Sequence, residues 1–148
     1  MHQFLKQHIK GNNLPEKDLI NFSVFLIFFE KEIKENYGNY AQKWNNATFN
    51  TFCTSNEIDK KVRTNQKRKN NYFIFEAQKG GKSINDYTHH FFRHIRNAFA
   101  HGNVNKKIEG RKRHAYYVIK DYNYNKKPTM DGKIRVDLFW QMIDLLLK

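Results

Sequence analysis

The sequence predicts a mainly α protein, an antiparallel helical bundle with a small β-hairpin before the C-terminal helix. Two long stretches, 15–37 and 83–102, carry apolar residues three or four positions apart, which is typical of amphipathic helices. A third such stretch, 137–147, closes the chain. Between 115 and 122 the apolar residues alternate instead, which favours a β-strand. Short connections between helices favour antiparallel neighbours and hence a bundle.

The first long helix is expected to begin after Asn13. Asn13 and Glu16 have the spacing of a capping box, and Pro15 suits the first turn because its missing N–H costs nothing there. Gly38 is expected to end the helix. A shorter amphipathic helix is expected over 2–9. The apolar stripe of the long helix consists of Leu19, Phe22, Leu26, Phe29 and Ile33.

The middle of the chain is its least regular part. Segments 47–52 and 58–62 are expected to form one broken helix or two short ones. The run 59–71 is rich in Lys and Arg, and two interpretations stay open. It is either a solvated loop or helix end, or a strip that follows the phosphates of a nucleic acid. Gly80 and Gly81 predict a turn.

The segment 83–102 predicts the helix that carries the most chemistry. Ser83 followed by Asp86 indicates its N-cap, and Gly102 is expected to end it. Such a helix packs on one side and offers bases and cations on the other. Its apolar stripe contains Phe91, Phe92, Ile95, Ala98 and Phe99. Its second stripe, rich in imidazole, contains His90, His94, Asn97 and His101.

The hairpin is expected to consist of the alternating stretch and a returning strand at 134–136. Pro128, Asp131 and Gly132 predict the turn between the two strands. Asp137 is expected to cap the last helix.

Composition favours a polyanionic partner. The chain carries 27 Lys and Arg against 14 Asp and Glu, a formal net charge of +13, and 16% of its residues are aromatic. Cys53 is the one cysteine, which excludes an internal disulfide and favours a reducing compartment. The longest apolar run, 24–29, is far short of the ~20 residues that span a bilayer. Since the N-terminus also lacks a signal-peptide pattern, we expect a cytoplasmic location and no membrane contact.

Metal binding is one alternative for the imidazole stripe. Asp86, His90 and His94 lie at i, i+4 and i+8, so a helix would turn all three toward one ion. Arg93 and Arg96 lie beside them and would repel a divalent cation, so no metal is expected. No cofactor is expected either, because no Gly-rich phosphate-binding loop follows a predicted strand.

Metal-free cleavage of RNA suits the stripe better. It needs groups that take and give protons near neutral pH, as histidine does, and a cation for the phosphate charge, as arginine is. Asn97 shares a face with His101 and would orient the imidazole or the phosphate. Arg96 lies five residues before His101, about 140° round an ideal helix. The two meet most easily if the helix loosens at Gly102, or if a second subunit supplies one of them. A purely structural role as helix-end donors and solvated cations stays open.

At these residues the chain resembles the HEPN superfamily. The run from Arg96 to His101 matches the arginine, polar residue, three spacers and histidine of the family motif. The long apolar helix before it, the variable segment after it and the terminal amphipathic helix follow the family outline. The resemblance implies one HEPN-like domain over 1–148 that dimerises, with the two motif helices at one cleft. It also implies metal-independent endoribonuclease activity that leaves 2′,3′-cyclic phosphate ends, in a toxin–antitoxin or antiviral system.

Carried over to this chain, the resemblance implies catalytic roles for Arg96, Asn97 and His101. RNA, a second copy of the chain and a cognate antitoxin or regulatory protein are the expected partners. A non-catalytic RNA-binding or adaptor subunit is the alternative. Some toxins of the family carry a modified tyrosine two positions after the histidine; Asn103 stands there, so such control is not expected. The residues expected to contact RNA are Arg93, His94, Lys106, Lys107, Arg111, Lys112 and Arg113.

Overall fold

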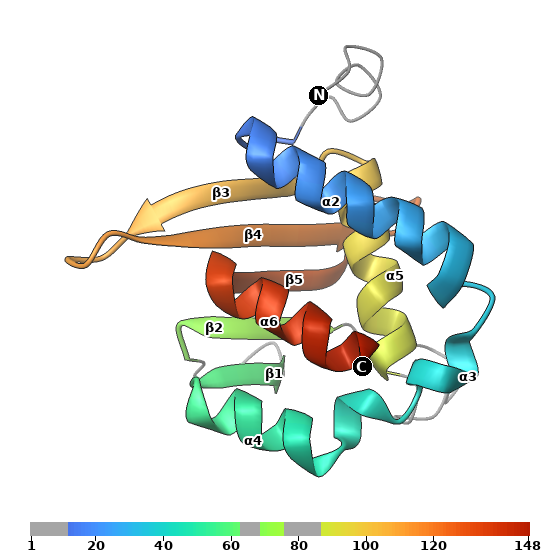
Figure 1. Ribbon diagram of the computed structural model, residues 1–148. Helices are drawn as coiled ribbons and strands as arrows, with labels where there is room; N and C mark the ends of the chain where they lie inside the picture. Colours follow the sequence, from blue (N-terminus) through green and yellow to red (C-terminus); the bar gives the residue numbers. More distant parts are fainter. Residues whose placement is uncertain (1–11, 63–68, 76–86) are drawn as a thin grey trace.

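The computed structural model describes residues 12–62, 69–75 and 87–148 (Figure 1). The helix expected over 2–9, the cap at Ser83 and Asp86 and the turn at Gly80 lie outside the described residues. The helical elements are α2 (Glu16–Phe28), a π-helical turn (Phe29–Ile33), α3 (Tyr37–Tyr40), a 3-10 turn (Lys43–Asn45), α4 (Ala47–Ser55), α5 (Tyr87–Ala100) and α6 (Val136–Leu147). The strands are β1 (Ile58–Val62), β2 (Asn71–Phe75), β3 (Val104–Glu109), β4 (His114–Tyr122) and β5 (Pro128–Arg135).

Within the described residues, five strands form one sheet in the order β1-β2-β5-β4-β3. The sheet is mixed, because β1 and β2 are parallel and the other pairs are antiparallel. Helices α5 and α6 pack on the sheet, and α4 lies beside β1 (Figure 1). The prediction of a mainly α antiparallel bundle is therefore wrong, since the described chain has an α/β fold. The predicted hairpin before the last helix exists, but as two strands of this larger sheet.

Strand β1 is where the sequence-based prediction departs furthest from the structure. The apolar spacing predicts a helix over 58–62, yet α4 ends at Ser55 and Glu57 turns the chain with a positive φ of 53°. Ile58 then pairs with Asn71 of β2 and is buried. Five residues are too few for apolar spacing to separate a strand from a helix, so the pairing partner decides.

Strand β5 explains why the predicted hairpin turn is misplaced. Pro128, Asp131 and Gly132 look like turn residues, but all three lie within β5. Gly132 pairs with Phe73 of β2, and a Cβ on this glycine would lie 2.5 Å from the Phe73 ring. Glycine is therefore needed for close approach of an aromatic ring rather than for a turn. The turn itself lies at 123–127.

Helix α2 begins and ends differently from the prediction. Its N-cap is Pro15, without a side-chain cap. Asn13 instead pairs with β3: its N–H donates to Val104 (3.2 Å) and its carbonyl accepts from Lys106 (3.2 Å). The backbone of Asn13 is thus committed to the sheet edge. At the other end the helix loosens into the π-helical turn, and Gly38 lies within α3 rather than after α2.

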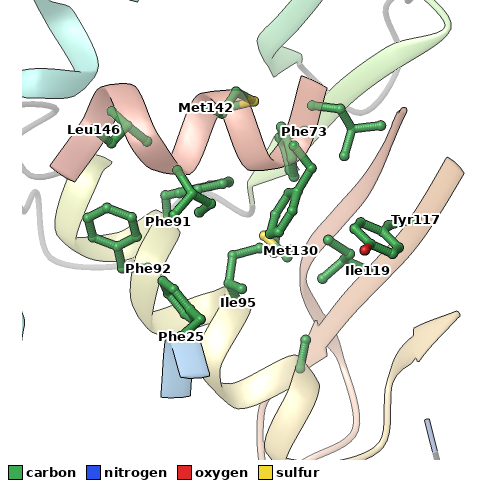
Figure 2. Packing of buried hydrophobic residues seen from close by; sticks show 14 of the residues in the cluster. Phe25, Phe73, Phe91, Phe92, Ile95, Tyr117, Ile119, Met130, Met142 and Leu146 are labelled. Atoms are coloured by element: carbon green, nitrogen blue, oxygen red, sulfur yellow. The ribbon is translucent and has the colours of Figure 1, made fainter. Parts of the chain in front are cut away.

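The apolar core lies between the sheet and the helices. Figure 2 shows side chains from α5, α6 and the strands meeting there. Phe22 of α2 stacks on Phe99 with ring centroids 5.2 Å apart, and Phe73 meets Phe91 edge-on at 5.1 Å. Each fully buried side chain of this size contributes ~1.5–3 kcal/mol relative to exposure, so this aromatic layer fixes α5 on the sheet. The fully buried aromatic residues include Phe22, Trp44, Phe49, Phe73, Phe91, Phe92, Phe99, Tyr117 and Phe139.

A polar cluster crosses this core, and we call it the Asp18 cluster. The Tyr117 hydroxyl donates to the buried Asp18 carboxylate and accepts from the Trp140 indole N–H at 3.0 Å. The Lys106 ammonium lies 2.9 Å from the same carboxylate. Because each polar group has a partner, the cluster joins α2, β3, β4 and α6 without an unsatisfied buried atom. In the described part of the chain, no helix has both the length and the apolar surface required for a membrane span.

Candidate active site

Helix α5 packs on strand β4 and also contacts α2 and α3. Its predicted apolar stripe is confirmed, because all five of its residues are buried. The helix ends in a Schellman motif: the N–H of Asn103 donates to Ala98 (2.8 Å) and that of Gly102 donates to Phe99 (3.1 Å). Gly102 has a φ of 77°, a conformation that glycine adopts without strain, so the prediction that it ends the helix is also confirmed. His101 is the last residue before the chain reverses.

Arg96 and Asn97 are joined on α5 by their side chains. The Arg96 guanidinium donates through Nη1 to Asn97 Oδ1 (3.0 Å) and through Nε to Glu30 Oε1 of the π-helical turn (3.0 Å). Asn97 Nδ2 in turn donates to Asp121 Oδ2 of β4 at 3.4 Å. The amide can point only one way, because a guanidinium requires an acceptor and a carboxylate requires a donor. Glu30 and Asp121 thus hold the arginine–asparagine pair from two sides.

His94 lies at the inner end of the same chain of hydrogen bonds. Its Nδ1 is 2.7 Å from Asp121 Oδ2, and the two side chains are only 7% and 4% exposed. The ring also lies against Phe75, with centroids 5.8 Å apart. The structure therefore places His94 in the interior, beside a carboxylate, rather than on the surface where a contact with RNA would form. We call Glu30, Arg96, Asn97, Asp121 and His94 the Asp121 cluster.

His101 lies outside the Asp121 cluster. Its backbone N–H donates to Asn97 (3.0 Å), which completes the last helical turn, and its side chain is exposed. Within the described residues the imidazole makes no hydrogen bond and no ion pair. The structure thus brings Arg96 and Asn97 into contact with each other and leaves His101 free at the helix end, one turn further along.

The basic residues expected to contact RNA are spread over the molecule. Arg93 is half-buried and bonds His90 at 3.2 Å, and Lys106 is engaged with Asp18, whereas Lys107 is exposed. The turn that carries Arg111, Lys112 and Arg113 lies at the tip of the β3–β4 hairpin, which projects away from α5 (Figure 1). At ~3.3 Å per residue, the six residues of β3 put this tip about 20 Å from the end of α5.

Of the three residues of the alternative metal site, the structure describes only His90 and His94. Asp86 lies outside the described residues, His90 bonds Arg93, and His94 bonds Asp121. Among the residues that the structure describes, no three His, Cys, Asp or Glu side chains form a group able to hold a metal ion. Cys53 is buried, and burial raises the pKa of its thiol to about 11, so it carries little thiolate at neutral pH.

The family of the chain follows from comparison with known proteins. The family described as HEPN pEK499 p136 matches residues 3–148, and the chain belongs to this HEPN family. The resemblance seen in the motif is thereby confirmed over almost the whole chain. HEPN domains are typically ribonucleases, so membership supports a nuclease or another RNA-related function in general. Searches among curated proteins and among solved structures give no match.

Two members of the Asp121 cluster are absent from the sequence-based prediction. Asp121 follows Tyr117 and Ile119 at every second position of β4, and all three are buried. An acidic residue in the buried phase of an alternating strand is a signal that it has a specific partner. Glu30 gives no such signal, because it lies among the alternating charges of 30–35.

Proposed function

We propose that this chain is a metal-independent endoribonuclease of a toxin–antitoxin or antiviral defence system, acting in the cytoplasm. The observation that carries the proposal is the arrangement on α5. Arg96 and Asn97 are held in one orientation by carboxylates, and an exposed His101 stands at the end of the same helix. The family match supports the reaction class.

Each side chain suits one part of RNA cleavage. His101 takes the proton from a 2′-hydroxyl or gives one to the leaving 5′-oxygen, and its exposure leaves the imidazole accessible to substrate. Arg96 uses Nε and Nη1 within the protein, which leaves Nη2 and the second Nη1 hydrogen for a phosphate oxygen. Asn97 keeps the guanidinium in place through its carbonyl oxygen. Attack of the 2′-oxygen on phosphorus breaks the bond to the 5′-oxygen and leaves a 2′,3′-cyclic phosphate.

Two proton-transfer groups are needed, and a homodimer supplies two copies of His101. The surface we assign to dimerisation is the outer side of α2, where Ile20, Val24, Ile27 and Phe28 form a stripe that is 38–60% exposed. Exposed apolar stripes of this kind mark interaction sites. Glu30, one turn beyond Ile27, binds Arg96, so a second copy on α2 lies next to the proposed site.

The test uses purified protein and mixed RNA in EDTA. The parent chain is compared with His101→Ala and Arg96→Ala. The matched controls are His114→Ala, at the end of β4 away from His101, and Arg135→Ala, at the end of β5. We expect cleavage in the parent and both controls, loss in both site variants, and cyclic phosphate ends by mass spectrometry. Light scattering of Val24→Glu against the parent tests the dimer: the variant should be monomeric.

The other outcomes separate the alternatives. RNA binding without cleavage in the parent supports the non-catalytic RNA-binding or adaptor role. Cleavage that needs added Mg²⁺ contradicts the metal-independent mechanism. Growth arrest on expression of the parent, relieved by His101→Ala, would support a toxin role, and co-purification of a neighbouring gene product would identify an antitoxin or regulatory protein.

A further inference from the structure

The turn between β4 and β5 lies at the same end of the sheet as His101. Val104, which follows the end of α5, pairs with Ile119 near the end of β4. The N–H of Lys120 also donates to the carbonyl of Asn103 at 3.2 Å. The chain therefore leaves β4 and enters the turn at 123–127 beside the α5 terminus. The hairpin tip at 110–113 lies at the opposite end of the same strands.

This turn has a fixed backbone. The Asn123 N–H donates to the Lys127 carbonyl (2.9 Å), and the Lys126 N–H donates to the Asn123 carbonyl (2.9 Å). The Asn123 side chain accepts from the N–H groups of Asn125 (2.9 Å) and Lys127 (3.1 Å). Lys126 has a positive φ of 61°, a conformation that a lysine rarely adopts without such support. Four hydrogen bonds thus hold the turn around one asparagine.

The fixed turn presents an aromatic ring to solvent. Tyr124 is 93% exposed, whereas Phe28 and Tyr122, the other exposed Phe and Tyr side chains among those whose burial the structure describes, are 38% and 37% exposed. Lys126 and Lys127 are exposed beside it, and neither makes an ion pair within the described residues. An exposed ring on a rigid turn gains nothing for the fold, since its apolar surface stays in water.

From these observations we propose that Tyr124, Lys126 and Lys127 form a binding site for single-stranded RNA next to the catalytic end of α5. An unpaired base stacks on the Tyr124 ring, and the two ammonium groups contact the phosphates on either side. Aromatic rings with interleaved cations are the usual means of holding single strands. This inference rests on the proposed function for its location, because the strand held here passes His101.

Chemistry favours RNA over a protein partner at this turn. The site combines one isolated ring with two uncompensated positive charges on a chain of net charge +13. A protein partner would need a broad apolar patch, which a single tyrosine does not provide. The hairpin tip offers Arg111, Lys112 and Arg113 without an aromatic ring, so it suits long-range attraction of RNA rather than placement of a base.

The experiment measures binding without cleavage. The full chain is titrated into a short single strand that is 2′-O-methylated throughout, which removes the nucleophile, and that carries 2-aminopurine, whose fluorescence falls when it stacks. Tyr124→Ala should bind about 5- to 100-fold more weakly and lose the quenching. Tyr124→Phe, which keeps the ring, should bind within about 3-fold of the parent. The double variant Lys126→Ala, Lys127→Ala should show a weaker salt dependence. Its plot of log K against log salt should be shallower by about 0.7 for each lost phosphate contact.

The outcomes separate this site from the proposed function. If the parent binds and cleaves RNA but Tyr124→Ala binds and quenches like the parent, the inference is overturned and the nuclease proposal stands. If Tyr124→Phe is as weak as Tyr124→Ala, stacking is not the interaction and the inference is again overturned. If the parent neither binds nor cleaves, both proposals fail. Because Tyr124, Lys126 and Lys127 are exposed, each variant should have the same melting temperature as the parent, which excludes misfolding as the cause.

Discussion

Two buried carboxylates in the described part of the chain, Asp18 and Asp121, are held in different ways. Asp18 is 4% exposed and its cluster is closed: Tyr117, Lys106 and Trp140 complete it, and every hydrogen bond stays within the fold. Asp121 is 2% exposed but its cluster is open. From His94 it runs through Asn97 to Arg96, whose side chain is 37% exposed.

The difference separates a structural role from a functional one. The Asp18 cluster joins four elements and ends on the Trp140 indole. Its hydrogen bonds therefore stabilise the packing of the helices on the sheet. The Asp121 cluster ends on a guanidinium that still has free donors at the surface. A buried carboxylate that orients an exposed cation positions that cation for a ligand. Variants of the two clusters should therefore separate stability from activity.

Asp18→Ala should give the largest loss of stability. It leaves the buried Tyr117 hydroxyl without its acceptor inside the core and the partly buried Lys106 ammonium without its carboxylate, a loss of about 3 kcal/mol. Urea denaturation would measure the free energy of unfolding. Exposed Asp144→Ala is the matched control and should change it by less than about 0.5 kcal/mol.

The Asp18 variant should nevertheless retain RNA cleavage at temperatures below its midpoint. Specific loss of cleavage in a folded Asp18→Ala protein would contradict the assignment of this cluster to structure alone.

Asp121→Asn should destabilise the fold less than Asp18→Ala does, but it should reduce RNA cleavage more. Both carboxylate oxygens of Asp121 accept N–H groups, Oδ2 from Asn97 and Oδ1 from Tyr122, so the new amide nitrogen meets a donor in either orientation. When it faces Asn97, the Asn97 amide must turn its own nitrogen toward Arg96. We expect a loss of about 1–3 kcal/mol in unfolding free energy and a fall of at least about tenfold in kcat for RNA cleavage.

The double variant Asn97→Asp with Asp121→Asn exchanges amide and carboxylate. It restores alternating donors and acceptors without changing net charge, and should recover most of the lost kcat. An inactive double variant that is as stable as the parent would show that Asn97 acts on the substrate directly rather than through Arg96.

Tyr117→Phe should change the dependence of stability on alkaline pH. Burial, and then the hydrogen bond to Asp18, raises the pKa of Tyr117 above its usual 10.0. The folded chain therefore holds this proton more tightly than the unfolded chain does. Its contribution is complete below about pH 10 and is lost as the pH rises above that value. Thermal melts between about pH 8 and 11 should fall less steeply in Tyr117→Phe, which also loses about 1 kcal/mol at the lower pH with its hydroxyl.

The parts of the fold that the sequence predicts are those with long-range periodicity within one element. The apolar stripe of α5 and its end at Gly102 follow from spacing and from one glycine, and the structure has both. The sheet cannot be predicted in the same way. β1 and β2 are five residues each, and their identity depends on partners far along the chain, such as Gly132 beside Phe73.

The candidate site likewise contains some residues that the sequence predicts and others that it does not. Arg96, Asn97 and His101 lie within six residues, so a local motif is enough to select them. Their catalytic roles stay predictions. Glu30 and Asp121 lie 66 and 24 residues away from their partners, and only the fold brings them to α5. His94 shares a helical face with His101 in the sequence, but β4 covers it with Asp121.

Glu30→Gln should have the smallest effect on stability and still sharpen the comparison. The Arg96–Glu30 pair is 37% and 38% exposed, and pairs of this kind contribute about 0.2–1 kcal/mol. Glutamine keeps an acceptor for Nε but removes the negative charge, so Arg96 stays in place with a more attractive field for phosphate. The free energy of unfolding should stay nearly unchanged. The KM for RNA should fall, and kcat should stay within about twofold of the parent value.

Glu109→Gln is the matched control for this variant, because Glu109 is also a partly exposed glutamate in an ion pair, with Lys133, and lies at the far end of β3 from α5. It removes the same charge away from the site, so its KM for RNA should stay closer to that of the parent. If Glu30→Gln instead lowers kcat as strongly as Asp121→Asn does, the charge of Glu30 is required to orient Arg96, and both carboxylates position it.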